Sequence, residues 1–292
     1  MIKLSDYVCN FFSAKGITHA FILGGGGNMH LIDSVDKSKL EYVCNLHEQA
    51  SSYAAEGYAR VTGKPGLCII TTGPGGTNTM SGVLGCWQDS IPMFVISGQI
   101  ARRFMGAGTK MGVRQLGVQE MNIVDVAKPM VKYAAVVMDP LDIRFELEKA
   151  WYLAITGRQG PVWLDIPLDV QSAMIDEKKL RKFNSAEVAS TYITNKKEIE
   201  KLVKQTLQKI SEAERPVLYA GNGIRLSGAY NDFLRLVDLL KIPVLTSYVG
   251  YDMLSSDHPY FFGRAHVMGQ RAGNLIIQNS DLLLSIGARL DV

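Results

Sequence analysis

Residues 44–60 read Cys44-Asn45-Leu46-His47-Glu48-Gln49-Ala50-Ser51-Ser52-Tyr53-Ala54-Ala55-Glu56-Gly57-Tyr58-Ala59-Arg60. The apolar run at residues 40–44 predicts a short buried strand, and the small residues after Glu48 predict a helix. Glu48 is therefore expected where a strand is followed by a helix, which in open parallel α/β sheets is the edge that binds ligands. A carboxylate in the first turn of a helix is also favoured by the helix dipole, by roughly 0.3 to 1 kcal/mol, so this stretch alone leaves a purely structural role open.

Length and composition indicate a globular protein. The chain has 292 residues, which predicts about two domains of ordinary size. Its net charge of +3 is too small to indicate a nucleic-acid partner. Because no apolar run approaches the ~20 residues of a membrane helix, no membrane association is expected. The N-terminus lacks the apolar core of a signal peptide, which favours a cytoplasmic location.

The four cysteines predict neither disulfides nor a metal centre. Cys9, Cys44, Cys68 and Cys86 lie in apolar sequence, and their spacing is not typical of a metal site. They are expected to be small core residues in a reducing compartment. No metal-ligating residue is predicted in this chain.

Short β-rich runs alternate with helical patterns through the first 168 residues. Strands are expected at residues 18–23, 40–44, 66–72, 92–97, 132–138 and 161–166. Helices are expected at residues 5–15 and from 49 to about 60. Further helices are expected after the turn at residues 73–78, ending at about 89, and at residues 141–157. This alternation predicts one α/β domain, residues 1–168, with a doubly wound parallel sheet covered by helices on both faces.

Three loops are expected to open at the same edge of this sheet, because parallel strands point the same way. They are the glycines at residues 24–27, the glycine-rich turn at 73–76, and the turn that carries Glu48. Glycines there allow backbone groups to approach a ligand without an intervening side chain. One run of glycines is weak evidence, whereas three convergent loops with one acid favour a binding site.

Five motifs together carry a resemblance to a known family. They are Gly24-Gly25-Gly26, His47-Glu48-Gln49-Ala50, Thr72-Gly73-Pro74-Gly75-Gly76-Thr77-Asn78, Asp89-Ser90-Ile91-Pro92 with Ser97-Gly98-Gln99, and Gln119-Glu120. In this order they resemble the pyrimidine-binding domain of thiamine-diphosphate enzymes, and they are most similar to the acetolactate synthase group. The resemblance implies the thiamine-diphosphate-binding fold for residues 1–168.

The resemblance also implies site residues. Glu48 would be catalytic, as the glutamate that hydrogen-bonds N1′ of the aminopyrimidine so that the thiazolium loses its C2 proton. A carboxylate shares a proton with a ring nitrogen most strongly in a dry pocket. Gln119 would be the second catalytic residue, facing the mouth of the active site. The cofactor-binding residues implied by the resemblance are Gly25, Gly26, Glu48, Pro74, Gly75 and Asn78. For Pro74 and Asn78, a structural turn remains the alternative.

Residues 100–118 depart from the acetolactate synthase pattern. The segment is longer and more basic than in that group, and residues 100–119 contain no acidic residue before Glu120. One interpretation is a mobile loop that recruits a carboxylate or phosphate of the substrate, and the other is a solvated glycine-rich loop. The departure indicates a relative with a specialised pathway. The basic residues of the segment are Arg102, Arg103, Lys110 and Arg114.

Residues 169–195 carry mixed charge and little periodicity, which predicts an interdomain linker. Residues 196–292 predict a second α/β unit. Its expected helices are residues 196–211, 228–240 and 272–279, and its expected strands are residues 215–220, 243–246 and 281–286. The unit resembles the family's central domain, which is Rossmann-like in layout, and is expected to be incomplete.

The second unit leaves FAD binding open. Gly221-x-Gly223 lacks the third glycine of the dinucleotide fingerprint. In acetolactate synthases this domain holds FAD, and the loops at residues 221, 246–248 and 287–291 match the positions that would contact it. Residues 263–274 depart from that pattern.

The implied activity is decarboxylation of a 2-oxo acid such as pyruvate, with transfer of the two-carbon unit to a carbonyl acceptor. Nothing resembles the family's Gly-Asp-Gly … Asn-Asn element for Mg²⁺ and the diphosphate, and Mg²⁺ prefers carboxylates together with phosphate oxygens. The chain is therefore expected to be the inactive N-terminal part of a longer enzyme, a homodimer or homotetramer whose remaining residues complete the site. The alternatives are a related decarboxylase, acetyltransferase or cyclic-dione hydrolase, and a non-catalytic nucleotide-binding or partner module.

Overall fold

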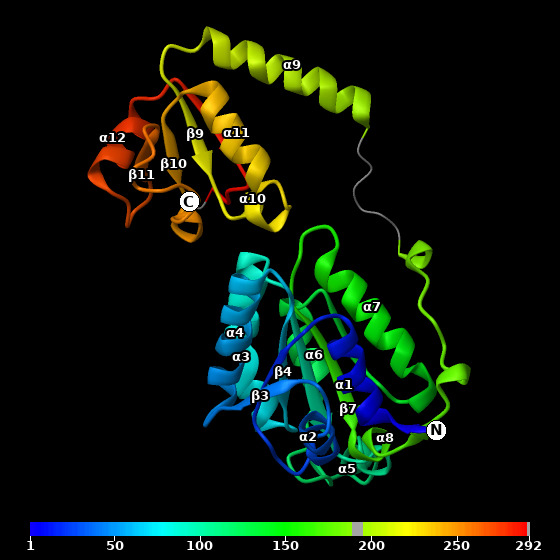
Figure 1. Ribbon diagram of the computed structural model, residues 1–292. Helices are drawn as coiled ribbons and strands as arrows, with labels where there is room; N and C mark the ends of the chain where they lie inside the picture. Colours follow the sequence, from blue (N-terminus) through cyan, green and yellow to red (C-terminus); the bar gives the residue numbers. More distant parts are fainter. Residues whose placement is uncertain (189–194, 291–292) are drawn as a thin grey trace. The chain divides into compact units, whose positions relative to one another are not determined.

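The computed structural model describes residues 1–188 and 195–290, in two compact units that divide between residues 190 and 191 (Figure 1). Six parallel strands form the sheet of the first unit, in the order β3-β2-β4-β5-β7-β6. The central strands β4, β5 and β7 are buried along their whole length, as in parallel sheets with both faces covered. The strands are β2 (His19–Ile22), β3 (Glu41–Cys44), β4 (Gly66–Ile70), β5 (Met93–Gln99), β6 (Tyr133–Val136) and β7 (Val162–Pro167).

The strand predicted at residues 40–44 forms, but the prediction that it is buried is wrong. β3 lies at the edge of the sheet, and all four of its residues are exposed. Cys44, expected in the core, is exposed on this strand, whereas the other three cysteines are buried. A short apolar run does not distinguish an edge strand from a central one, because both show the same pattern.

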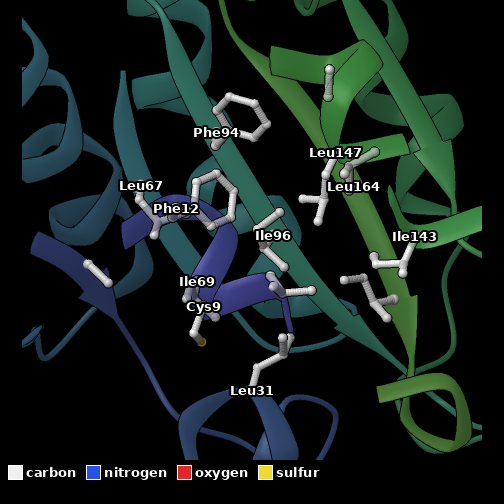
Figure 2. Close-up of a cluster of buried hydrophobic side chains, with 14 of the residues drawn as sticks. Cys9, Phe12, Leu31, Leu67, Ile69, Phe94, Ile96, Ile143, Leu147 and Leu164 are labelled. Atoms are coloured by element: carbon white, nitrogen blue, oxygen red, sulfur yellow. The ribbon is translucent and has the colours of Figure 1, made fainter. Parts of the chain in front are cut away.

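Helices cover both faces of the sheet, so the predicted doubly wound arrangement is confirmed. On one face lie α1 (Leu4–Ala14), α2 (Met29–Asp36), α7 (Ile143–Ile155) and α8 (Leu168–Gln171); on the other lie α3 (Glu48–Thr62), α4 (Pro74–Asp89) and α6 (Ile123–Ala127) (Figure 1). Figure 2 shows the core beneath the first group, where Phe12 of α1 packs edge-to-face on Phe94 of β5 with ring centroids 5.0 Å apart. Burying such a side chain contributes roughly 1.5 to 3 kcal/mol, so this core fixes the sheet that carries the loops.

Short elements follow β7 and pack on the first unit. β8 (Met174–Ile175) pairs antiparallel with β1 (Ile2–Lys3), and α8 contacts α1 and α2. β8 and all of α8 except its first residue lie within the predicted linker, of which residues 189–194 are outside the described residues. The remaining short elements of the unit are α5 (Ala107–Lys110) and the 3-10 turns η1 (Arg102–Phe104), η2 (Lys128–Met130), η3 (Pro140–Asp142), η4 (Glu177–Lys179) and η5 (Ser185–Glu187).

The second unit contains a four-stranded parallel sheet in the order β11-β10-β9-β12. One face packs with α11 and the other with α12, as in a Rossmann-like layer arrangement. Across residues 1–188 and 195–290, no helix is long and apolar enough to span a membrane. The elements are α9 (Lys196–Glu212), β9 (Pro216–Ala220), α10 (Gly223–Leu226), α11 (Tyr230–Leu240), β10 (Val244–Thr246), η6 (Tyr248–Gly250), β11 (Phe261–Arg264), α12 (Arg271–Gln278) and β12 (Leu282–Ile286).

Candidate active site

Glu48 is the first residue of α3, four residues after the end of β3, which is the junction that the sequence predicts. His47 caps the helix, because its Nδ1 accepts a hydrogen bond from the backbone N–H of Gln49 at 3.2 Å. The Glu48 side chain is buried, and its Oε2 accepts a hydrogen bond from Asn78 Nδ2 at 3.0 Å. The two residues come from α3 and α4, so the packing of these helices sets the orientation of the carboxylate.

The second glycine-rich turn supplies the other wall beside Glu48. Pro74 occupies the first turn of α4, where a proline ring fits a helix start, and Gly75 follows it. A Cβ at Gly75 would stand 3.4 Å from Glu48 Oε1 and 2.9 Å from Thr71 Cγ2. Only glycine therefore leaves this side of the carboxylate open.

Gln119 is brought to the same region through its backbone. A Cβ at Gly73 would stand 2.3 Å from the carbonyl oxygen of Gln119, so the two chain segments are in direct contact. Gln119 has a positive φ of 58°, an uncommon conformation for a residue with a side chain. Such conformations persist where the surrounding structure imposes them, and they cluster at functional sites.

The first glycine loop packs against Thr71, which the sequence analysis missed, and against Thr72. A Cβ at Gly25 would stand 2.6 Å from Thr71 Oγ1, and one at Gly27 would stand 1.9 Å from Thr72 Oγ1. The N–H of Gly27 donates to Thr71 Oγ1 at 3.1 Å. Apart from Gly26 and the two residues adjoining it, no described atom would lie within 4 Å of a Cβ at Gly26, so this position is open. The signal for Thr71 was its position at the end of a strand next to the Gly73 turn.

Thr71 therefore connects the predicted site residues. It touches the positions of Gly25 and Gly75, and Gly75 lies beside Glu48, which accepts from Asn78. The structure brings these four predicted residues together at the carboxyl edge of the sheet. Pro74 and Gln119 adjoin them through their backbones.

A buried polar network lies further along the same sheet edge. Asp165 of β7 accepts hydrogen bonds from Ser97 Oγ at 2.5 Å and from Gln99 Nε2 at 2.9 Å, and Trp163 Nε1 donates to the same serine at 2.8 Å. Burial raises the pKa of Asp165 to about 7, although the two hydrogen bonds to its carboxylate act in the opposite direction. The Ser97-Gly98-Gln99 motif thus satisfies a buried carboxyl group.

The basic segment 100–118 is partly tied to the unit. Arg102 Nε donates to Asp169 Oδ2 at 2.7 Å, so this arginine is engaged in a structural ion pair. Glu120 accepts from the N–H groups of Leu116 and Gly117, at 3.3 and 3.2 Å. Arg114 lies at a cavity of about 380 Å³ whose other lining residues include Gln99, Gln115, Glu120, Asn122 and Asp165.

Loops of the second unit converge at the carboxyl ends of its strands. A Cβ at Gly221 would stand 2.4 Å from the Cα of Ala288, so this glycine permits close packing of two loops. Thr246 Oγ1 is buried at the end of β10 and has no hydrogen-bond partner among the described residues. His266 and Asn274 hydrogen-bond each other within the divergent segment 263–274. Asp291 lies outside the described residues.

Comparison with known proteins shows two matching family models. Residues 2–126 match the thiamine pyrophosphate enzyme N-terminal TPP binding domain, and residues 203–292 match the thiamine pyrophosphate enzyme central domain.

Similar curated proteins cover nearly all of this chain. A probable acetolactate synthase large subunit of Methanocaldococcus jannaschii is 32% identical over 291 residues, which are 99% of this chain and 47% of the relative. One from Methanococcus aeolicus is 36% identical over 279 residues, 94% of this chain and 45% of the relative. The chloroplastic acetolactate synthase 1 of Nicotiana tabacum is 34% identical over 292 residues, 99% of this chain and 42% of the relative. The chain spans slightly less than half the length of these relatives.

Proposed function

Since the chain belongs to the thiamine pyrophosphate enzymes, of which it carries the N-terminal and central domains, we propose that it is part of an acetolactate synthase-like carboligase. In this proposal the enzyme decarboxylates a 2-oxo acid such as pyruvate and transfers the two-carbon unit to a carbonyl acceptor. The first unit supplies the pyrimidine half of the thiamine diphosphate site. The observation that carries the proposal is the buried carboxylate of Glu48, hydrogen-bonded by Asn78 beside Gly75.

The residues around Glu48 fit an aminopyrimidine ring. Asn78 is a neutral donor, so it orients the carboxylate without neutralising it. The side of Glu48 Oε1 is kept open by Gly75, where any side chain would contact both Glu48 and Thr71. A charge-assisted hydrogen bond is stronger than a neutral one, and more so away from water, which suits a carboxylate that shares a proton with a ring nitrogen.

When bound, thiamine diphosphate supplies an acidic ring carbon that adds to the 2-oxo acid and accepts the electrons left by the loss of carbon dioxide. Glu48 would share a proton with the pyrimidine nitrogen, and Asn78 would keep the carboxylate in place. Gly25 and Gly26 would border the space in which the substrate reacts, with Pro74 on the opposite loop. Gln119 would contact substrate at the mouth of the site.

Mg²⁺ and the diphosphate would be bound by residues of a longer chain. Within residues 1–188 and 195–290, no group of three or more His, Cys, Asp or Glu side chains could hold a metal ion. We propose that the complete site forms in a homodimer or homotetramer. We also propose a cytoplasmic location, since all four cysteines are free thiols, as in a reducing compartment.

FAD is the second cofactor that the proposal includes, in the second unit. Thr246 Oγ1 is a buried hydroxyl without a partner among the described residues, at the carboxyl end of β10. Ligands of open parallel sheets bind at this edge, and buried polar atoms are normally hydrogen-bonded. The hydroxyl would therefore contact a polar group of the cofactor, next to the loops at residues 221 and 287.

The test is the substitution Glu48→Gln in the full-length enzyme loaded with thiamine diphosphate and Mg²⁺. We expect proton exchange at the cofactor C2, followed by NMR in D₂O, to fall at least a hundredfold, because a carboxamide cannot share its proton with the ring nitrogen as a carboxylate does. The matched control is Glu41→Gln, since Glu41 is exposed on β3. Unchanged exchange in Glu48→Gln would refute the assigned role.

A separate titration tests the division of the cofactor site. The 292-residue chain with Mg²⁺ should bind thiamine diphosphate only weakly, because the proposed diphosphate half is supplied elsewhere. Micromolar binding by this chain alone would contradict that division and leave the role of Glu48 to the exchange experiment.

A further inference from the structure

The short helix α8, directly after β7, contacts the first glycine loop through one buried side chain. Gln171 is completely buried. Its Nε2 donates hydrogen bonds to the carbonyl oxygens of Gly27 and Ile166, both at 2.7 Å. Gly27 and Gln171 are 144 positions apart in sequence, so this contact joins the glycine loop to the last strand of the sheet.

The chemistry of this contact requires a carboxamide. Two carbonyl oxygens face the amide nitrogen of Gln171, and its two hydrogens satisfy both of them. The Oε1 atom is buried without a partner among the described residues, so the side chain is oriented by its nitrogen alone. A glutamate would place a carboxylate oxygen against two carbonyl oxygens, and an apolar side chain would leave both carbonyls without these bonds.

Gly27 is confined on its other sides as well. A Cβ at Gly98 of β5 would stand 2.0 Å from the Gly27 carbonyl oxygen, so the loop lies directly on that strand. The N–H of Gly27 donates to Thr71. Gly26, the neighbouring residue, is the open position of the loop. The hydrogen bond from Gln171 therefore fixes Gly27, the residue that follows the open position Gly26 in the glycine loop.

The same helix contacts the basic segment through a second side chain. Asp169 accepts from the backbone N–H of Arg102 at 2.9 Å through Oδ1 and from its Nε at 2.7 Å through Oδ2. Arg102 Nη1 also donates to the carbonyl oxygen of Met138 at 2.8 Å. Asp169 thus fixes the start of the segment 100–118, and Gln171, two residues later in the same helix, fixes the glycine loop.

We propose that Gln171 and Asp169 are positioning residues, which set the glycine loop and the start of the basic segment for the reaction. The proposal rests on the proposed function, in which the glycine loop borders the reacting substrate. Gln171 acts through Gly27, and Asp169 acts through Arg102. Neither side chain needs to touch the substrate.

Hydrogen–deuterium exchange on the 292-residue chain tests the contacts without any activity. Gln171→Met keeps the side-chain length and removes the donor, so amide exchange should rise at least tenfold at residues 24–28 and stay within twofold at residues 101–105. Asp169→Asn should give the reverse pattern. Each variant is the control for the other, because general destabilisation would raise exchange in both segments. A rise in both segments, or in neither, would overturn the proposal.

Kinetics of the full-length enzyme test the consequence. Gln171→Met should lower kcat at least tenfold and change KM for the 2-oxo acid by less than threefold, because the loop geometry acts on the reacting group. The matched control is Ser34→Ala, which removes the hydrogen bonds between Ser34 Oγ and the side chains of Ser5 and Asp6 on α1. Unchanged kcat despite faster exchange at residues 24–28 would overturn the positioning role. Absence of all activity in the unmodified enzyme would instead refute the proposed function, since the exchange result does not depend on it.

Discussion

Asp165 gives a pH dependence of stability that can be tested on this chain directly. Its carboxyl group is buried, and burial raises its pKa from the ordinary 3.8 to about 7. Between these two values the folded protein retains a proton that the unfolded chain has lost. Stability therefore falls as pH rises through this window, because the unfolded state binds fewer protons than the folded state.

The size of the effect follows from the two pKa values. The difference between 3.8 and about 7 corresponds to about 4 kcal/mol of lost stability above neutral pH. Between pH 5 and pH 7 the loss should be about 2 kcal/mol, because the slope is close to 1.4 kcal/mol per pH unit until the folded group itself begins to titrate. Asp165→Asn removes the titration and keeps an acceptor for Ser97 or Gln99.

The assay is urea unfolding of both proteins at pH 5, 6, 7 and 8. The stability of Asp165→Asn relative to the unmodified chain should increase by about 2 kcal/mol between pH 5 and pH 7 and level off above pH 7. Asp257→Asn, an exposed position in the second unit, is the matched control and should show no such trend. A relative stability that stays constant from pH 5 to pH 8, or that falls, would refute the reasoning about Asp165.

Three further predictions concern residues of α3 and α4, and urea unfolding measures each. Gly82→Ala should destabilise by about 1 to 3 kcal/mol, because its Cβ would stand 2.3 Å from Ser52 Oγ and 2.6 Å from Ser52 Cβ. Gly57→Ala should stabilise by roughly 0.5 to 1 kcal/mol, since no described atom lies within 4 Å of its added Cβ and alanine favours the helix; equal effects of the two changes would contradict this account. Asp89→Asn should lower the free energy of unfolding by about 1 kcal/mol, because it removes the ion pair with Arg60 at 2.5 Å. The loss should be smaller in 1 M salt.

The position of Glu48 was predictable because it depends on local signals. An apolar run before it and small residues after it predict a strand and a helix, and a parallel sheet places their junction at the binding edge. The same reasoning failed for the burial of β3, because the position of a strand within a sheet depends on its partners and not on its own pattern. β11 was missed for a related reason, since its four residues include Gly263 and show no clear alternation.

Residues that act between distant segments were not predictable. Gln171 lies in a segment that was expected to be a linker, and its partner Gly27 is 144 positions away in the sequence. Thr71 was expected near the end of a strand beside the Gly73 turn, but that position does not indicate a contact with the distant Gly25. Such contacts follow from the strand order β2-β4-β5-β7, which the sequence analysis did not derive.

The structure changes the meaning of the glycines that first indicated a site. Glycine was expected there because it allows a ligand to approach the backbone. At Gly25 and Gly27, however, the space that a side chain would occupy is filled by Thr71 and Thr72 of this chain. These two glycines are required by the fold, whereas the space at Gly26 is open among the described residues. Of the three, only Gly26 therefore supports a ligand by the original argument, and the case for the site rests mainly on the Glu48 carboxylate and its orientation by Asn78.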